Sequence, residues 1–144
     1  MSQEDSVTKL RLLEGYRFRV EFDGENMPSL IVDETMPIGL GAGPNPARLL
    51  ASAVGHCTSS SLVYCLQKAR IRVRDLETTV NTSVDRNEEG RWRVSSLDVQ
   101  LRLEVDEEDR MRVLTCLKIF EDYCTVTQSL RKGIPVNINV IRQP

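Results

Sequence analysis

The chain has 144 residues and a formal net charge of -2, with 40% hydrophobic and 28% charged residues. These values are typical of one globular domain, and we take residues 1–144 as a single domain. The charges of both signs are interspersed, which argues against nucleic-acid binding. The polar N-terminus carries no signal or transit pattern, and no apolar run approaches the roughly 20 residues of a membrane span. We therefore expect a cytoplasmic protein with no membrane partner.

The N-terminal part of the sequence predicts a hairpin and a third strand. Apolar and charged residues alternate over residues 16–22, and residues 8–22 together predict two strands with a turn at Glu14-Gly15. SLIVDE gives a short third strand. The next segment, MPIGLGAGPNP, holds three glycines and three prolines in eleven residues and is therefore a loop. It lacks the GxGxxG and GK[ST] patterns of phosphate-binding loops, so we interpret it as a lead-in to a helix.

A long helix is predicted from Asn45-Pro46 to about Ala69. Asparagine is a favoured N-cap and proline a favoured first helical residue. Few positions between Pro46 and Lys68 carry charge, so the helix should be buried on several sides. A domain of this size rarely buries such a helix alone, which indicates an oligomer.

The C-terminal part predicts two long strands, one or two helices and a last strand. The strands cover residues 71–85 and 91–106 and are joined by RNEEG. Asp106 is expected to cap a helix with apolar residues at helical spacing, which are Met111, Leu114, Leu117 and Phe120. TVTQSLRKG predicts a further short helix ending at Gly133, and IPVNINV a final strand. The order β-β-β-α-β-β-α-(α)-β defines an α+β fold with largely antiparallel sheets.

The four cysteines do not suggest a metal site or a structural disulfide framework. Cytoplasmic thiols are mostly reduced. Cys57 and Cys65 are eight residues apart, as are Cys116 and Cys124. Zinc ligand pairs usually have about two to four intervening residues, so we expect no metal and no bound cofactor.

Two segments carry a resemblance to a known family. GPNPARLLASAVGHCTSSSLVYCLQKARI and, further on, FEDYCTVTQSLRKGIPVNINV resemble the OsmC/Ohr family of osmotically induced and organic-hydroperoxide-resistance proteins. The shared features are the glycine-rich loop and Asn-Pro before a long helix, a cysteine inside that helix, and a second cysteine before the last strand. The resemblance implies an intertwined homodimer with two central helices and active sites at the interface.

The resemblance also implies a thiol-dependent peroxidase that acts on organic hydroperoxides or hydrogen peroxide. Cys57 would attack the peroxide and become a sulfenic acid, and Cys124 would resolve it as a disulfide. An external thiol or dithiol would then reduce that disulfide. The alternative is a non-catalytic dimer that binds a small ligand or senses oxidation.

The sequence departs from the family where the thiolate is activated. Characterised members have a glutamate directly after the Asn-Pro and an arginine in an early loop, whereas this chain has Ala47 and no arginine in that loop. A thiolate in apolar surroundings needs a cation or hydrogen-bond donors. Arg17, Arg19 and Arg48 are therefore candidate thiolate-stabilising residues. Arg48 is about 180° from Cys57 around the same helix, so it would serve only the partner chain's site.

The remaining candidates follow from helix geometry. His56 is adjacent to Cys57 in sequence but about 100° away around the helix, so only a minor role is expected. Cys124 precedes a short helix, whose N-terminus would favour its thiolate. Cys65 and Cys116 are expected to be packing residues of the core.

Overall fold

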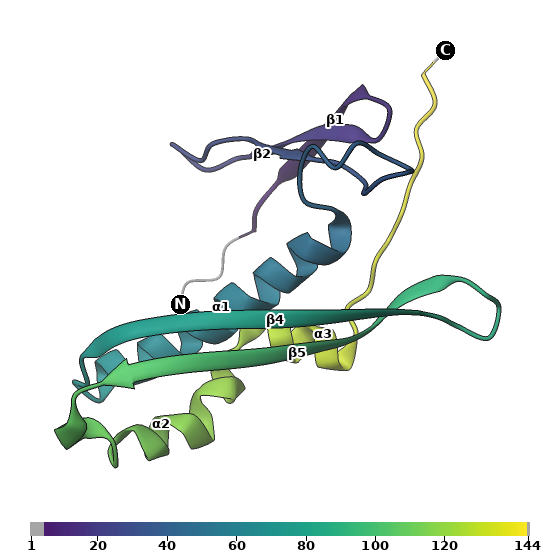
Figure 1. The fold of residues 1–144 in the computed structure, drawn as a ribbon. Coiled ribbons are helices and arrows are strands. Elements are labelled where there is room, and N and C mark those ends of the chain that lie inside the picture. The colour runs from purple at the N-terminus through teal and green to yellow at the C-terminus, as the bar shows by residue number, and fades with distance from the viewer. Residues whose placement is uncertain (1–4, 144) are drawn as a thin grey trace. The chain divides into compact units, whose positions relative to one another are not determined.

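The computed structural model describes residues 5–143, and Figure 1 draws its helices and strands. The chain divides into two compact units. One unit comprises Met1–Ala51 and Thr82–Leu97, and the other comprises Ser52–Asn81 and Asp98–Pro144. The long helix and the two long strands contribute residues to both units. That the chain is a single domain stays a prediction.

The N-terminal unit contains the predicted hairpin and third strand. Strands β1 (Thr8–Glu14), β2 (Arg17–Phe22) and β3 (Leu30–Val32) form an antiparallel sheet in that order. Gly15 in the first turn has a φ of 57°, which glycine adopts without steric cost. On the apolar face of the alternating pattern Val20 is buried and Phe18 is half-buried, whereas Tyr16 and Phe22 are exposed. Val32 of β3 is also buried.

The glycine-rich loop of this unit is organised by the buried carboxylate of Asp33. Asp33 Oδ1 accepts the Glu34 N–H at 2.8 Å, and Oδ2 accepts the Leu40 and Ala42 N–H groups at 3.1 Å each. A side chain at Gly43 would collide with the Ile31 carbonyl. The loop amides thus bind a carboxylate of the chain itself, which explains the glycines without a phosphate.

Helix α1 (Pro46–Lys68) begins as predicted, with Asn45 Oδ1 accepting the Arg48 N–H at 3.0 Å. By length and composition alone this helix could cross a membrane, which corrects our statement that no apolar run is long enough. Core helices pass the same test, and six α1 residues are buried in the fold. The helix therefore fits the expected central element.

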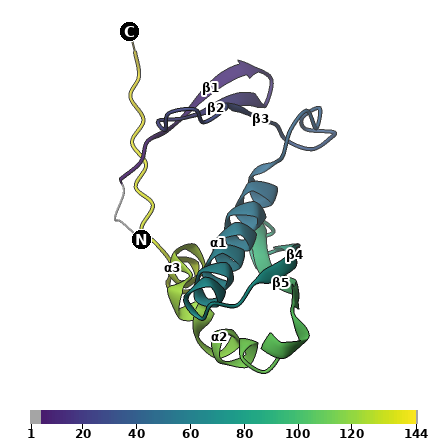
Figure 2. The same cartoon turned by 90° about the vertical axis from the view of Figure 1, so that its left-hand side faces the viewer.

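The second unit has a hydrophobic core between α1, strands β4 (Val73–Arg86) and β5 (Trp92–Val105), and the C-terminal helices (Figure 2). On β5, which lies within the predicted strand, the side chains from Leu97 to Val105 alternate between half-buried and exposed. The buried members of the core are Leu62, Leu66, Ile71, Val113, Cys116, Phe120 and Cys124.

The predicted helix after Asp106 is wrong in its extent and in its buried face. The segment forms two 3-10 turns, Glu107–Asp109 and Phe120–Tyr123, on either side of α2 (Val113–Ile119). The side chain of Asp106 makes no cap, because its carboxylate accepts a hydrogen bond from Arg74 Nε at 2.7 Å. Of the four residues predicted to be buried, Phe120 lies in the core, whereas Met111, Leu114 and Leu117 are exposed. Val113 and Cys116 of α2 face the core instead.

Helix α3 (Thr125–Lys132) ends at Gly133, as predicted, with a glycine φ of 72°. The predicted last strand is absent, because residues 134–143 have no regular secondary structure. Ile134, Val136, Ile138 and Val140 are 56–85% exposed. Within residues 5–143 no strand pairs with this segment, so its alternating pattern has no sheet to join.

Candidate functional site

The sulfur of Cys57 lies at the N-terminus of α3. Cys57 is on α1 and is half-buried against the core. Its Sγ accepts a hydrogen bond from the backbone N–H of Val126 at 3.3 Å. Val126 is the second residue of α3, so its N–H is one of those that a helix leaves without an internal partner. Such an N–H and the helix dipole both favour a thiolate over a thiol.

Cys124 is the residue immediately before α3 and is fully buried. Cys124 is the N-cap residue of α3, but its side chain does not cap the helix. Its S–H instead donates to the Phe120 carbonyl oxygen at 3.7 Å. We expected the N-terminus of α3 to favour the Cys124 thiolate. In the structure the Val126 N–H at this helix end donates to Cys57 Sγ instead, and both cysteines lie in one hydrophobic core.

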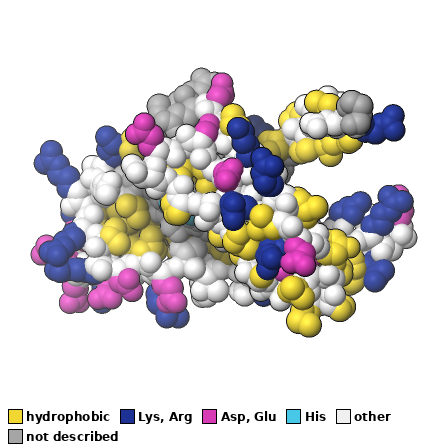
Figure 3. Space-filling model, turned by 90° about the horizontal axis from the view of Figure 1, so that it is seen from above, with side chains coloured by type: hydrophobic (Ala, Val, Ile, Leu, Met, Phe, Trp, Pro, Cys, Tyr) yellow, Lys and Arg dark blue, Asp and Glu magenta, His cyan; other side chains and the backbone are white. Residues whose placement is uncertain are grey.

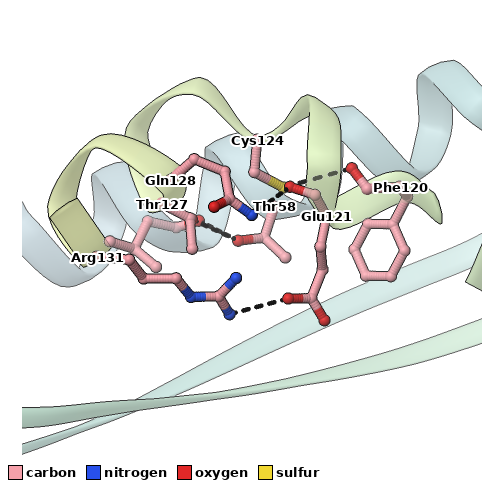
Figure 4. Close-up of polar contacts among 8 residues, drawn as sticks. Thr58, Phe120, Glu121, Cys124, Thr127, Gln128 and Arg131 are labelled. Carbon is pink, nitrogen blue, oxygen red and sulfur yellow. Dashed lines mark hydrogen bonds and ion pairs between the residues drawn. The ribbon is translucent and has the colours of Figure 1, made fainter. Parts of the chain in front are cut away.

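Hydrogen bonds on both sides of Cys124 hold the turn into α3 (Figure 4). Arg131 Nη2 pairs with Glu121 Oε2 at 2.8 Å, and Gln128 Nε2 donates to the Glu121 carbonyl at 3.0 Å. Between the helices, the Thr58 and Thr127 hydroxyls are 3.3 Å apart. Thr58 follows Cys57 on α1 and Thr127 follows Val126 on α3, so this second contact holds the Cys57 sulfur against the N-terminus of α3.

Of the other candidate residues, His56 does not lie on the side of α1 that carries this sulfur. His56 is exposed, while Cys57 faces inward, as the helix geometry predicts. Arg17 pairs with Glu14 at 3.4 Å. Arg17, Arg19 and Arg48 belong to the N-terminal unit and Cys57 to the other, so their role at the thiolate stays a prediction.

Cys65 and Cys116 also lie in the core of the second unit, as predicted. Cys116 is buried and Cys65 is half-buried. Burial, together with a hydrogen bond and charge interaction with Cys65, raises the pKa of the Cys116 thiol to about 11.

One group of acidic side chains in the described residues is close enough to suggest a cation, namely Asp106, Glu108 and Asp109. Two of the three already have cationic partners. Asp106 pairs with Arg74, and Asp109 pairs with Arg112. These guanidinium groups supply the positive charge, so the cluster carries no argument for a metal.

The fold and the site together define a small α+β protein with two cysteines between its central helix and a short C-terminal helix. A family model described as OsmC-like protein matches residues 39–139. The chain therefore belongs to the OsmC-like family, which confirms the resemblance seen in the sequence. A comparison with curated protein sequences gives no significant match.

Solved structures share this fold at low sequence identity. An OsmC-like protein of unknown function from Vibrio cholerae is 11% identical, with a TM-score of 0.76 over 88% of this chain and 94% of that chain. An organic hydroperoxide resistance protein OsmC from Legionella pneumophila is 19% identical, with a TM-score of 0.64 over 91% and 92%. The organic hydroperoxide resistance protein OhrB of Bacillus subtilis is 20% identical, with a TM-score of 0.60 over 89% and 91%. At these identities the likeness establishes the fold alone.

Proposed function

We propose that the chain is a thiol-dependent peroxidase that reduces organic hydroperoxides or hydrogen peroxide in the cytoplasm. Cys57 is the attacking cysteine and Cys124 the resolving cysteine. The proposal rests on one observation, which is the hydrogen bond from the Val126 N–H to Cys57 Sγ. Val126 lies at the N-terminus of α3, the helix that begins directly after Cys124. In the characterised family members a glutamate and an arginine stabilise the thiolate. In this chain, which lacks them, the Val126 N–H supplies part of that stabilisation.

The difference in burial supports the two roles. Cys57 is half-buried and Cys124 is fully buried, so a peroxide reaches Cys57 first. The Cys57 thiolate attacks the distal peroxide oxygen, the O–O bond breaks, and the alkoxide leaves as an alcohol after taking a proton. Cys124 then attacks the Cys57 sulfenic acid, a disulfide forms and water leaves. The two thiols supply the two electrons, and an external thiol or dithiol returns them.

The chain's exposed apolar surface supports a homodimer, as the family resemblance implies. Exposed hydrophobic side chains stand among charged ones in Figure 3. They include Met36, Ile38 and Leu40 of the glycine-rich loop and Tyr64 of α1. Exposed apolar surface of this kind is typical of an interface. A partner chain would also bring its own Arg17, Arg19 or Arg48 toward the thiolate.

The test uses the reduced protein and one equivalent of cumene hydroperoxide, followed by alkylation and peptide mass mapping. We expect a Cys57–Cys124 disulfide, steady turnover with a dithiol, and loss of both in Cys57→Ser. Ser60→Ala, at an exposed position of the same helix, should react like the wild type. A disulfide without turnover would make the protein a sensor, and four alkylatable thiols would reject the catalytic assignment.

A further inference from the structure

We propose that Glu121 is a positioning residue for the resolving step. Through Arg131 and Gln128 it holds the backbone of Cys124 in place, so that only the Cys124 side chain has to turn for the two reacting sulfurs to meet. The inference rests on the proposed function, in which Cys124 resolves the oxidised Cys57. It adds residues that contact neither the peroxide nor the attacking sulfur.

Cys124 occupies the position whose side chain normally caps helix α3. It is the N-cap residue, and Val126 is the second residue of the helix. The side chain of an N-cap residue usually accepts the backbone N–H of the second or third helical residue. A rotation of Cys124 about its Cα–Cβ bond to the capping position would therefore bring its sulfur toward the Val126 N–H.

The sulfur of Cys57 is already bonded to that same N–H. Cys57 Sγ accepts the Val126 N–H at 3.3 Å, whereas the Cys124 S–H points to the Phe120 carbonyl oxygen at 3.7 Å. The Cys124 side chain would thus meet the Cys57 sulfur when it turns into the capping position. The rotation breaks one S–H hydrogen bond, which is a weak one. It succeeds only while the backbone of Cys124 stays where it is.

Glu121 fixes that backbone from the preceding turn. Its carbonyl oxygen accepts the Cys124 N–H at 3.1 Å and the Gln128 side-chain amide at 3.0 Å. Its carboxylate pairs with Arg131 at 2.8 Å, as Figure 4 shows. Gln128 also donates its backbone N–H to the Cys124 carbonyl at 2.9 Å. The C=O of Cys124 is therefore tied directly to α3, and its N–H is tied to α3 through Glu121.

The resolving step itself is a thiol attack on a sulfenic acid. The Cys124 thiol loses its proton and its sulfur attacks the Cys57 sulfur, the S–O bond breaks, the hydroxide takes up a proton and leaves as water, and an S–S bond forms. A sulfenic acid that is not resolved is oxidised by further peroxide to a sulfinic acid. The contacts of Glu121 therefore act on the resolving step and on the fate of oxidised Cys57, not on the first attack.

The test measures the attack of Cys124 on Cys57 without a peroxide. In C65A/C116A, Cys57 and Cys124 are the only remaining thiols. Dithiobis(nitrobenzoic acid) forms a mixed disulfide with the half-buried Cys57 and releases one coloured thiolate. Attack of Cys124 on the Cys57 sulfur releases a second thiolate and leaves the Cys57–Cys124 disulfide. The two releases report the accessibility of Cys57 and the positioning of Cys124 separately.

Removing the contacts of Glu121 should slow the second release alone. We expect Arg131→Gln to slow it about twofold to fivefold, the range of an exposed ion pair. Adding Gln128→Ala, which also removes the donor to the Glu121 carbonyl, should slow it about tenfold or more. Arg131→Lys, which keeps the positive charge, should restore most of the rate. The matched control is Lys132→Gln, which removes the same charge at the next position of α3 and should react like the C65A/C116A background.

Excess cumene hydroperoxide gives the corresponding result for the peroxidase. The Arg131→Gln/Gln128→Ala variant should convert more Cys57 to sulfinic acid than the Lys132→Gln control, as measured by peptide mass. A Cys57 that does not react with hydroperoxide, but closes a disulfide with the aromatic reagent, would reject the peroxidase and leave the role of Glu121 intact.

The role of Glu121 is itself rejected by either of two results. One is an equal second release in Arg131→Gln/Gln128→Ala and in Lys132→Gln, both folded by circular dichroism. The other is no second release at all in C65A/C116A. If C65A/C116A does not fold, the substitutions are made in the wild-type chain, and the appearance of the Cys57–Cys124 peptide pair is followed over time by mass mapping, with the same expected order of rates.

Discussion

The sulfur of Cys57 takes the place that a capping side chain usually takes at a helix N-terminus. Serine, threonine, aspartate or asparagine normally accepts the N–H of the second or third helical residue. At α3 the capping position is Cys124, whose sulfur is turned away to the Phe120 carbonyl. The Val126 N–H is consequently bonded by a residue of another helix. A charged acceptor binds an N–H more strongly than a neutral one, so a hydrogen bond of this kind is stronger to a thiolate than to a thiol.

Removing this single N–H should slow the reaction of Cys57. Val126→Pro deletes the donor, and since hydrogen bonds to charged groups contribute roughly 1.5–3 kcal/mol, we expect alkylation of Cys57 at neutral pH to fall by about tenfold or more. The rate is measured with iodoacetamide and peptide mass mapping. Hydroperoxide turnover should fall in parallel.

The control for Val126→Pro is Thr125→Pro. Proline is favoured at the first helical position, and Cys124 before it has an extended backbone (φ -76°, ψ 91°) that suits a residue preceding proline. This control keeps the Val126 N–H and should react like the wild type. Equal rates in the two variants, both folded by circular dichroism, would mean that the hydrogen bond does not activate Cys57.

Asp33 makes the glycine-rich loop sensitive to acid. The N–H of Ala42, with those of Leu40 and Glu34, lowers the pKa of this carboxyl below 3.8, although its burial acts in the opposite direction. A carboxyl whose pKa is lower in the folded state stabilises the fold above its unfolded pKa, and that stability is lost as pH falls through the folded pKa. The loop should therefore open below about pH 4.

Cleavage of the loop by a protease reports this opening. We expect pepsin to cut residues 35–41 faster as the pH falls through that range. Asp33→Asn should raise the cleavage rate and remove much of its pH dependence, because an amide has one acceptor oxygen where three N–H groups converge. Glu34→Gln, one residue away, should keep the wild-type profile. A wild-type profile in Asp33→Asn would show that the carboxylate does not hold the loop.

Sequence analysis finds candidate reactive side chains more readily than the groups that could activate them. Cys57 and Cys124 stand out because their surroundings resemble a family motif. The Val126 N–H has no signature, since every residue except proline carries one. Asp33 was overlooked because its three partners are also backbone amides. The burial of Cys116 depends on which face of α2 packs against the core, and the spacing of apolar residues does not select that face.

At the level of elements, α1 packs closely on β4 through its smallest residues. A Cβ added to Gly55 would lie 2.9 Å from Val80 Cγ2, closer than real Cβ contacts. One turn on, the Ser59 hydroxyl is 2.6 Å from that of Thr78. Glycine inside a helix costs about 1 kcal/mol relative to alanine. The close approach of helix and strand is what offsets this cost, and it holds the face of α1 that carries Cys57 toward α3.

A large side chain at Gly55 should therefore destabilise the second unit. We expect Gly55→Leu to lower the free energy of unfolding by about 1–3 kcal/mol, the usual range for overpacking. The measurement is urea denaturation followed by circular dichroism. Val80→Ala in the Gly55→Leu background should restore part of the loss, because it removes the methyl group that the new side chain meets. Additive effects of the two substitutions would mean that they do not share this contact.

The sequence predicts a helix or strand correctly where periodicity or end residues mark it clearly, and fails where they do not. The first hairpin, α1 and α3 have clear periodicity or end residues, such as Asn45-Pro46 and Gly133, and the structure confirms them. The region of α2 has apolar residues on more than one face. Only contact with the core selects Val113 and Cys116 over Met111 and Leu114, and that contact cannot be predicted from spacing.

At the level of the whole molecule, the segment after Gly133 has a strand pattern but no strand to pair with. Ile134, Val136, Ile138 and Val140 alternate with polar residues, yet all four are exposed in the described chain. An extended segment leaves its N–H and C=O groups unpaired, so such a segment readily adds to the edge of another sheet. This property explains why the sequence predicted a strand that one chain alone does not form. If the chain forms the homodimer proposed above, we expect the second copy to cover this segment.

Substitutions on the two faces of this segment should show whether it pairs as a strand with a second chain or stays unpaired. If a second chain covers the apolar face, Val136→Lys with Ile138→Lys buries two charges at the interface, and burying unpaired charges is strongly unfavourable. Asn137→Lys with Asn139→Lys places the same charges on the opposite face, because side chains alternate along a strand. Sedimentation equilibrium should give twice the chain mass of 16.3 kDa for the wild type and for the Asn137/Asn139 variant. The Val136/Ile138 variant should shift toward the monomer mass.

Hydroperoxide turnover should fall with the loss of dimer, because a partner chain's arginines would no longer reach Cys57. A Val136/Ile138 variant that stays dimeric and active would mean that the apolar face of the segment lies outside the interface.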